Sequence, residues 1–290
     1  MIYLAVIIEP FVEFAFMQRA LLGAVMLSVC ACPVGVFLTL RRMSLTGDAM
    51  SHAILPGAAA GFLLYGLKII PMTIGGLIAG MFVALGAGAV ARLTIQKEDA
   101  SMAAFYLISL SLGVLLVSLR GSSVDLMHVL FGTVLALNND ALLLIALVSI
   151  TTTILLWVFW RALVAECMDP LFLRSVSRLG MPVHFIFLGL VVINLVAGFQ
   201  ALGTLLSVGL MILPAAAARF WTQRVLTMCL FATCIGLASS VGGLLMSYHL
   251  ALPSGPSIIL SAGVFYFVSV VVSPRGLLFS RLYLRNYRRA

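Results

Sequence analysis

Asp48 and His52 are the two residues whose types and spacing point most directly to chemistry. They lie four positions apart at the start of an apolar stretch, in a chain that keeps most ionisable groups out of such stretches. Residues four apart share one face of a helix. A carboxylate and an imidazole on one face are a good donor pair for a divalent transition metal. The pair therefore predicts a metal pathway.

A simpler interpretation of the same pair is structural. Asp48 would cap the start of the helix, and His52 would lie at the membrane interface, hydrogen bonded to a carbonyl. Against it, ionisable groups beyond a membrane boundary are costly and usually face a polar pathway. Spacing alone leaves both interpretations open. A metal site would also need more than two ligands, and a second copy facing the first would supply two aspartates and two histidines.

A helix over about 49–66 would have to position this pair. The polar face would hold Ser44, Asp48, Ser51, His52 and Leu55, with Ala53, Gly57 and Gly61 roughly opposite. The spacing Gly57-x-x-x-Gly61 lets another helix backbone approach closely. The glycine face can then pack on a neighbour while the polar face turns to a cavity rather than to lipid.

The composition places this helix in a membrane protein. Of the 290 residues, 63% are hydrophobic and 9% are charged, and the mean hydropathy is +1.21. A soluble domain could not carry this composition without large exposed apolar patches. Lysine and arginine outnumber the acidic residues by 17 to 9, which indicates orientation in the membrane rather than a nucleic acid partner. The five cysteines have no metal or redox spacing and are predicted to be buried structural thiols.

The apolar pattern predicts an all-α polytopic membrane protein with one permease domain over 1–290. Eight stretches are long enough to cross a bilayer, at about 17–40, 49–66, 70–91, 101–119, 141–160, 183–201, 225–248 and 256–273. A ninth apolar piece at 202–214 is too short to span unless it is tilted or shielded by protein. We expect it to return the chain across the membrane.

The basic residues support this return segment. With it, fourteen of the 17 basic residues fall on one side, and Arg19, Lys68 and Arg120 remain on the other. The positive-inside rule then predicts a cytoplasmic location for the connection at 161–182, the loop at Arg219 and Arg224, and the basic tail at 275–290. The expected location is the inner membrane of the cell, in contact with lipid. The side on which the amino terminus lies stays open.

No phosphate-binding loop of the Gly-x-x-x-x-Gly-Lys-Ser/Thr type occurs, so energy must come from a partner or a gradient. The longest polar connection contains Asp169-Pro170, which can start a short helix, and Gly180, which can end it. Such a helix, with Phe172, Arg174 and Arg178, could dock into a partner. A plain amphipathic connector fits equally well.

Other polar residues are weaker signals. His128, His184 and His249 stand alone near segment ends and are predicted to be interfacial, hydrogen-bonded histidines. Asn194 and Gln200 lie inside an apolar run, where they could line a pore or bridge helices.

Taken together, these residues resemble the permease family of the metal-ion ABC importers, which carry zinc, manganese or iron. The resemblance covers nearly the whole chain and lies in 38–57, 130–135, 169–170, 203–219 and 253–257. It is most specific in Gly47-Asp48-x-x-Ser51-His52. The departures are modest: Pro256 stands where a small residue is expected, and Met168 precedes Asp169 where the family varies.

The resemblance implies the roles of these segments. Asp48 and His52 would line the metal path, and about 169–180 would be the coupling element seated on the ATPase. Two permease copies would work with two ATP-binding subunits and an extracytoplasmic metal-binding protein. The chain itself would be a transport permease without a permanently bound cofactor. Zinc, manganese and iron are not separated by the sequence, because aspartate and histidine suit all three.

Two other classes compete with this interpretation. A gradient-driven carrier could use Asp48 as a proton site, but such folds often repeat a broken helix in two halves, and the pattern around Asp48 is not repeated later in the chain. An intramembrane protease would need His-Glu-x-x-His, a serine and histidine pair or two buried aspartates. No such zinc motif is present, and no second acidic residue follows Asp48 well inside a span.

Overall fold

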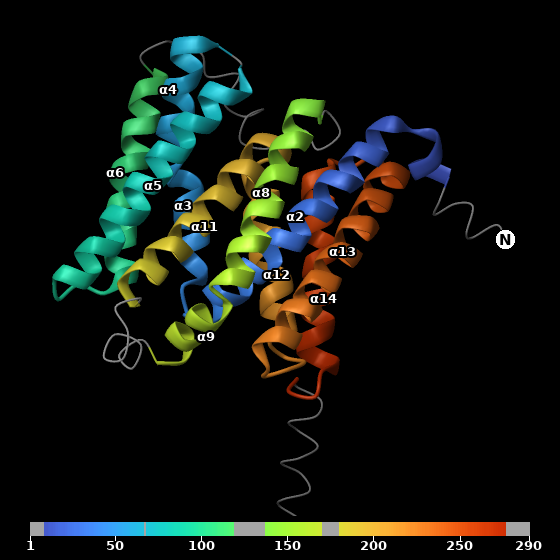
Figure 1. Cartoon of the computed structure of the whole chain (residues 1–290). Coiled ribbons are helices and arrows are strands. Elements are labelled where there is room, and N and C mark those ends of the chain that lie inside the picture. Colours follow the sequence, from blue (N-terminus) through green and yellow to red (C-terminus); the bar gives the residue numbers. More distant parts are fainter. Residues whose placement is uncertain (1–8, 67, 119–136, 170–179, 277–290) are drawn as a thin grey trace, which may run out of the picture.

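The computed structural model describes residues 9–66, 68–118, 137–169 and 180–276, and within these ranges the chain is helical without any strand. Figure 1 shows long helices running side by side in a bundle. The helices are α2 (Ala15–Leu40), α3 (Ser44–Ala53), α4 (Leu55–Tyr65), α5 (Ile69–Leu93), α6 (Glu98–Ser118), α8 (Asn139–Val158), α9 (Trp160–Met168), α11 (Gly180–Leu202), α12 (Thr204–Ala218), α13 (Val225–Leu250) and α14 (Ser254–Val272). The prediction of an all-α membrane protein is confirmed.

Seven helices of the described ranges are long and apolar enough to cross a membrane, namely α2, α5, α6, α8, α11, α13 and α14. Each corresponds to one predicted segment. The prediction of one helix over 49–66 for the eighth segment is wrong in detail. Two helices, α3 and α4, cover this segment, and the first of them begins at Ser44. The two helices meet at Ile54, which ends one and precedes the other. Pro56 explains the break, since it lacks the N–H that would bond to the carbonyl of His52.

The short helix α12 is the predicted return segment, with its bounds moved from 202–214 to Thr204–Ala218. At about 1.5 Å per residue it is shorter than the ~30 Å hydrocarbon core of a bilayer. Gly203, with a φ of 91°, allows the chain to reverse between α11 and α12. Because α12 packs against α2, α11, α13 and α14, this short helix is surrounded by protein as expected.

The core of the bundle lies around α2 and α11. In their most apolar windows 67% of α2 and 78% of α11 is buried, against 17–33% in the other spans. The outer helices therefore present apolar side chains to lipid. The glycine motif packs as predicted, because α4 lies against α5 so closely that a Cβ on Gly57 would overlap the carbonyl oxygen of Gly75.

Many polar side chains inside the spans form hydrogen bonds to the backbone or to each other. Ser28 and Thr39, for example, donate to carbonyl oxygens four residues earlier, at 2.7 and 2.8 Å. Asn194 in α11 donates to the hydroxyl of Thr152 in α8 at 2.9 Å. Of the two roles considered for Asn194, lining a pore or bridging helices, the structure shows the bridge between α11 and α8.

The prediction of buried thiols holds for part of the chain. Cys30, Cys32 and Cys229 are buried free cysteines, and Cys167 is half-buried. The prediction is wrong for Cys234, which is exposed on the surface of α13. An apolar thiol on an outer helix can face lipid without cost, so an apolar run alone does not decide burial.

Within the described ranges, links that carry basic residues gather at one end of the bundle. The links α5–α6 and α12–α13 lie at the same end of the bundle as α9, the lower end in Figure 1. The link between α2 and α3 belongs to this end too, since Arg41 forms an ion pair with Glu166 of α9. We call it the basic end.

Candidate functional site

Helix α3 carries Asp48 and His52 on the face that the rest of the chain leaves open. Its buried residues are Thr46, Gly47, Met50, Ser51 and Ala53, and they pack against α2, α5, α6, α11 and α12. The side chain of Asp48 is 66% exposed and that of His52 is 37% exposed. The predicted pair therefore shares one outward face of α3.

The geometry of the pair suits chelation. His52 Nε2 and Asp48 Oδ1 are 4.0 Å apart, too far for a hydrogen bond. Two donors bound to one metal ion at about 2.1 Å each lie roughly 3.0–3.5 Å apart. Small side-chain rotations would bring both atoms to one ion. Among the described residues no group of three or more His, Cys, Asp or Glu side chains could hold a metal, so Asp48 and His52 alone make at most a half-site within the described part of the chain.

Two details of the predicted polar face are corrected by the structure. Ser51 does not lie on it, because this serine is buried and its hydroxyl donates to the carbonyl of Asp48 at 2.7 Å. The interpretation of Asp48 as a helix cap is also wrong. Helix α3 begins at Ser44 after Met43, and Asp48 stands one turn inside it. The carboxylate of Asp48 is thus left for another role.

A second carboxylate lies near the pair. Asp99, in the first turn of α6, lines with Asp48 a cavity of about 250 Å³ that also includes Tyr106. Sequence reasoning missed Asp99, because an acidic residue before an apolar run is typical of any helix start. Its proximity to Asp48 depends on the packing of α3 against α6.

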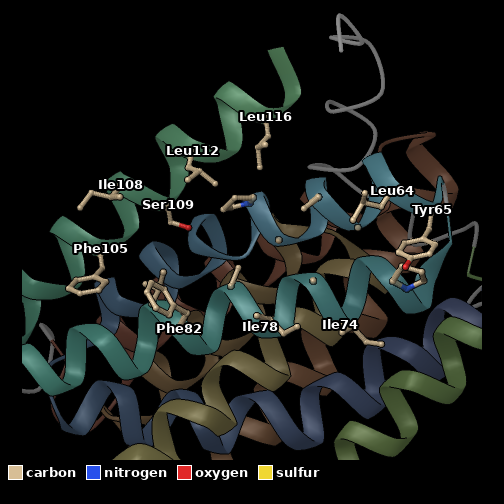
Figure 2. A pocket seen from close by; sticks show the side chains of 18 residues that line it. Leu64, Tyr65, Ile74, Ile78, Phe82, Phe105, Ile108, Ser109, Leu112 and Leu116 are labelled. Carbon is tan, nitrogen blue, oxygen red and sulfur yellow. The ribbon is translucent and has the colours of Figure 1, made fainter. Parts of the chain in front are cut away.

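A second cavity offers no His, Cys, Asp or Glu side chain as a metal ligand. It is a groove of about 820 Å³ between α4, α5 and α6, and Figure 2 shows it lined by apolar side chains such as Phe82 and Leu112. The hydroxyl of Ser109 in this lining donates to the carbonyl of Ala53 at 2.9 Å. The groove suits hydrocarbon rather than an ion.

A buried cluster of ionisable side chains closes the basic end. Glu166 in α9 accepts a hydrogen bond from Arg92 of α5 at 2.9 Å and pairs with Arg41 at 3.1 Å. His184 Nε2 in α11 lies 2.9 Å from Glu98 Oε1 of α6, at ion-pair distance. The side chains of Arg41, Arg92, Glu166 and His184 are each less than 10% exposed, and that of Glu98 is 30% exposed. We call these five residues the ionic cluster.

Glu166 is surrounded by nitrogen atoms of the ionic cluster. Arg41 Nη1 lies 3.2 Å from His184 Nδ1, and His184 Nδ1 lies 3.5 Å from Glu166 Oε1. Burial by itself would raise the pKa of Glu166, but the neighbouring His184 and the two arginines outweigh burial and hold that pKa below its ordinary value.

The ionic cluster corrects the prediction for His184. This histidine is hydrogen bonded as expected, but it is buried among charges rather than placed at an interface. Glu166 already pairs with Arg41 and Arg92, and within the described residues the cluster forms no group of metal ligands. Each member ends or begins a different helix, and nothing in the local sequence links them.

The predicted coupling segment lies mostly outside the described residues. Asp169 follows α9 in an extended conformation, and Gly180 is the first residue of α11. Pro170, Phe172, Arg174 and Arg178 fall outside the described ranges. Within the connection at 161–182, α9 (Trp160–Met168) forms the first part and the start of α11 forms the last.

Comparisons with known proteins agree with this architecture. The model of the ABC 3 transport family matches residues 13–273. The manganese import system permease protein ScaB of Streptococcus parasanguinis is 32% identical over 92% of this chain and 94% of its own length. The manganese transport system membrane protein MntC of Listeria innocua is also 32% identical, over 94% of this chain and 97% of its own.

A solved structure supports the same conclusion. PsaBC from Streptococcus pneumoniae, in complex with Fab, matches with a TM-score of 0.83 and 32% identity over 98% of this chain and 100% of its own. Family match, relatives and fold therefore coincide over almost the whole length. The chain belongs to the ABC 3 transport family and is a multi-pass protein of the cell membrane.

Proposed function

We propose that this chain is the membrane-spanning permease subunit of an ABC importer that carries a divalent transition metal ion into the cytoplasm. Manganese is the first candidate, since several relatives are named for manganese import, and zinc and iron have the same ligand preferences. The observation that carries the proposal is the pair of Asp48 and His52 on the open face of α3, 4.0 Å apart.

The proposal includes a second copy of the chain. One copy supplies two donors, whereas zinc takes four ligands and manganese prefers a wider shell. Leu45, on the same face as Asp48, is 80% exposed, an apolar surface beside a polar pair. Two copies facing each other through α3 would cover Leu45 and bring two aspartates and two histidines together. The path would then run between the copies.

The energy source in this proposal is a separate ATP-binding subunit. The chain carries no phosphate-binding loop, so the permease itself is not an enzyme. The segment from Asp169 to Gly180, with Phe172, Arg174 and Arg178, would dock on that subunit at the basic end. An extracytoplasmic metal-binding protein would deliver the ion to the opposite end, and lipid would fill the groove between α4, α5 and α6.

The test is metal uptake by cells that express the chain with its ATP-binding subunit and metal-binding protein. Cells with the permease should accumulate radioactive manganese faster than cells without it, and a hydrolysis-deficient ATP-binding subunit should abolish the difference. Competition by zinc and by ferrous iron would rank the three metals. Equal accumulation with and without the permease would overturn the proposal. Uptake that survives loss of ATP hydrolysis but stops with an uncoupler would favour a gradient-driven carrier.

A further inference from the structure

The ionic cluster joins the metal-site helix to both helices that flank the proposed coupling segment. Arg41 ends α2 and lies seven residues before Asp48. Glu166 lies three residues before Asp169, and His184 lies four residues after Gly180. Arg41 contacts both, at 3.1 Å to Glu166 and 3.2 Å to His184. One side chain thus connects α9 and α11 with the start of α3.

Arg41 is held from several sides. Its guanidinium lies over the ring of Phe187 in α11, 4.2 Å from the ring centre, and its side chain is 7% exposed. Phe37, one turn earlier in α2, contacts both Phe187 and Trp160 of α9 edge to face. A rigid contact of this kind cannot be stretched without burying an unpaired charge, which is strongly disfavoured. Arg41 must therefore follow α9 when α9 moves.

The link from Arg41 to α3 is too short to absorb such a movement. Only Arg42 and Met43 separate Arg41 from Ser44, the first residue of α3. Met43 is buried, and its N–H donates to the carbonyl of Leu38 at 2.9 Å. A displacement of Arg41 is therefore passed to α3 and to the face that carries Asp48 and His52.

We propose that Arg41 and Glu166 are positioning residues that couple the cytoplasmic helix α9 to the metal-site helix α3. The proposal rests on the proposed function, because it needs an ATP-binding subunit that acts at the basic end. Neither residue touches the metal. Their ion pair sets where α3 stands for a given position of α9, so that a change at the ATP-binding subunit alters the ligand geometry.

The test is the number of manganese ions transported per ATP hydrolysed by the complete complex in proteoliposomes. Glu166→Gln keeps the side-chain size and removes the charge. It should lower this ratio about tenfold, within the range usual for coupling between sites, while ATP hydrolysis continues. Glu98→Gln is the matched control, because Glu98 pairs with His184 and does not connect α9 to α3. Its ratio should stay within about twofold of wild type, well short of that coupling range.

A milder variant keeps the test decisive if Glu166→Gln does not fold. Arg41→Lys keeps the charge but loses the planar group that stacks on Phe187 and pairs with Glu166. It should also lower the ratio, with assembly of the complex intact. A spin label at Leu45 gives an independent readout. Its mobility should change when the ATP-binding subunit is trapped with vanadate in wild type and should change less in Arg41→Lys.

The outcomes separate the coupling inference from the proposed function. Wild-type complex that imports no metal would overturn the proposed function. Wild-type complex that imports metal, together with a wild-type ratio in every folded variant of Arg41 and Glu166, would overturn the coupling inference alone. An equal loss in Glu98→Gln and Glu166→Gln would also overturn it, because the cluster would then act only through stability.

Discussion

Because the backbones of α4 and α5 are in contact at Gly57, we expect Gly57→Ala to destabilise the protein strongly although it adds only one methyl group. A Cβ at Gly57 would overlap the carbonyl of Gly75 and stand 2.7 Å from the Cβ of Ala79, where ordinary contact begins at 3.4 Å. The helices would have to separate by about 0.7 Å or more to relieve the second contact alone. A backbone carbonyl cannot rotate away as a side chain can, so α4 itself must move.

The expected magnitude follows from this geometry. Overpacking a filled interior costs about 1–3 kcal/mol, and a clash with backbone belongs at the upper end. A loss near 3 kcal/mol would lower the melting temperature of the purified permease by about 5 °C or more. Because α4 follows α3 directly at Ile54, the displacement should also reach His52 and reduce metal uptake.

Thermal unfolding of the purified permease in detergent and uptake in cells measure both effects. Gly263→Ala is the matched control, because a Cβ at Gly263 in α14 would meet nothing within 4 Å. Alanine favours a helix over glycine by about 1 kcal/mol, so this variant should melt at or above the wild-type temperature. A Gly57→Ala protein that melts with wild type and takes up metal normally would refute the close approach of α4 and α5.

Three further predictions concern the basic end and the orientation. The pKa of Glu166 is lowered from its ordinary value of 4.5 in the folded state. The difference in melting temperature between wild type and Glu166→Gln should therefore be constant above about pH 5 and should shrink as the pH falls below 4.5. A difference that grows in acid would contradict the paired carboxylate. In a cysteine-free background, Thr222→Cys should react with an impermeant thiol reagent only in inverted vesicles and Lys68→Cys only in intact cells, and the reverse pattern would invert the topology. Reversing the charge at both Arg174 and Arg178 should reduce copurification of the ATP-binding subunit without lowering the melting temperature, and full copurification would remove the coupling role from this segment.

The spans could be predicted from the sequence because hydropathy is a local property. Twenty apolar residues cross a bilayer wherever they occur, and α2, α5 and α11 lie within a few residues of their predicted bounds. The break at Ile54 could not be fixed in the same way, although Pro56 marks it. A proline can be accommodated in a membrane helix, and its effect depends on the neighbours.

In the candidate site, too, local features could be predicted from the sequence and long-range contacts could not. Asp48 and His52 lie on one face of one helix, so their spacing alone predicted that they come together. The ionic cluster draws Arg41, Glu166 and His184 from three distant segments. In the sequence, each of these residues stands near the end of an apolar segment, where a charged side chain is typical of an orientation signal or of the membrane interface. Only the packing of the helices shows that these charges neutralise one another.

The most direct test of the metal path is transport by variants of Asp48 and His52 in the reconstituted complex. Asp48→Asn and His52→Ala should each abolish manganese uptake while assembly and basal ATP hydrolysis persist, because each removes one donor per copy from a site with few donors. Asp140→Asn and His249→Ala, exposed residues of the same types in α8 and α13, should transport normally. Uptake at the wild-type rate by both Asp48→Asn and His52→Ala would contradict the assignment of the path to this face of α3.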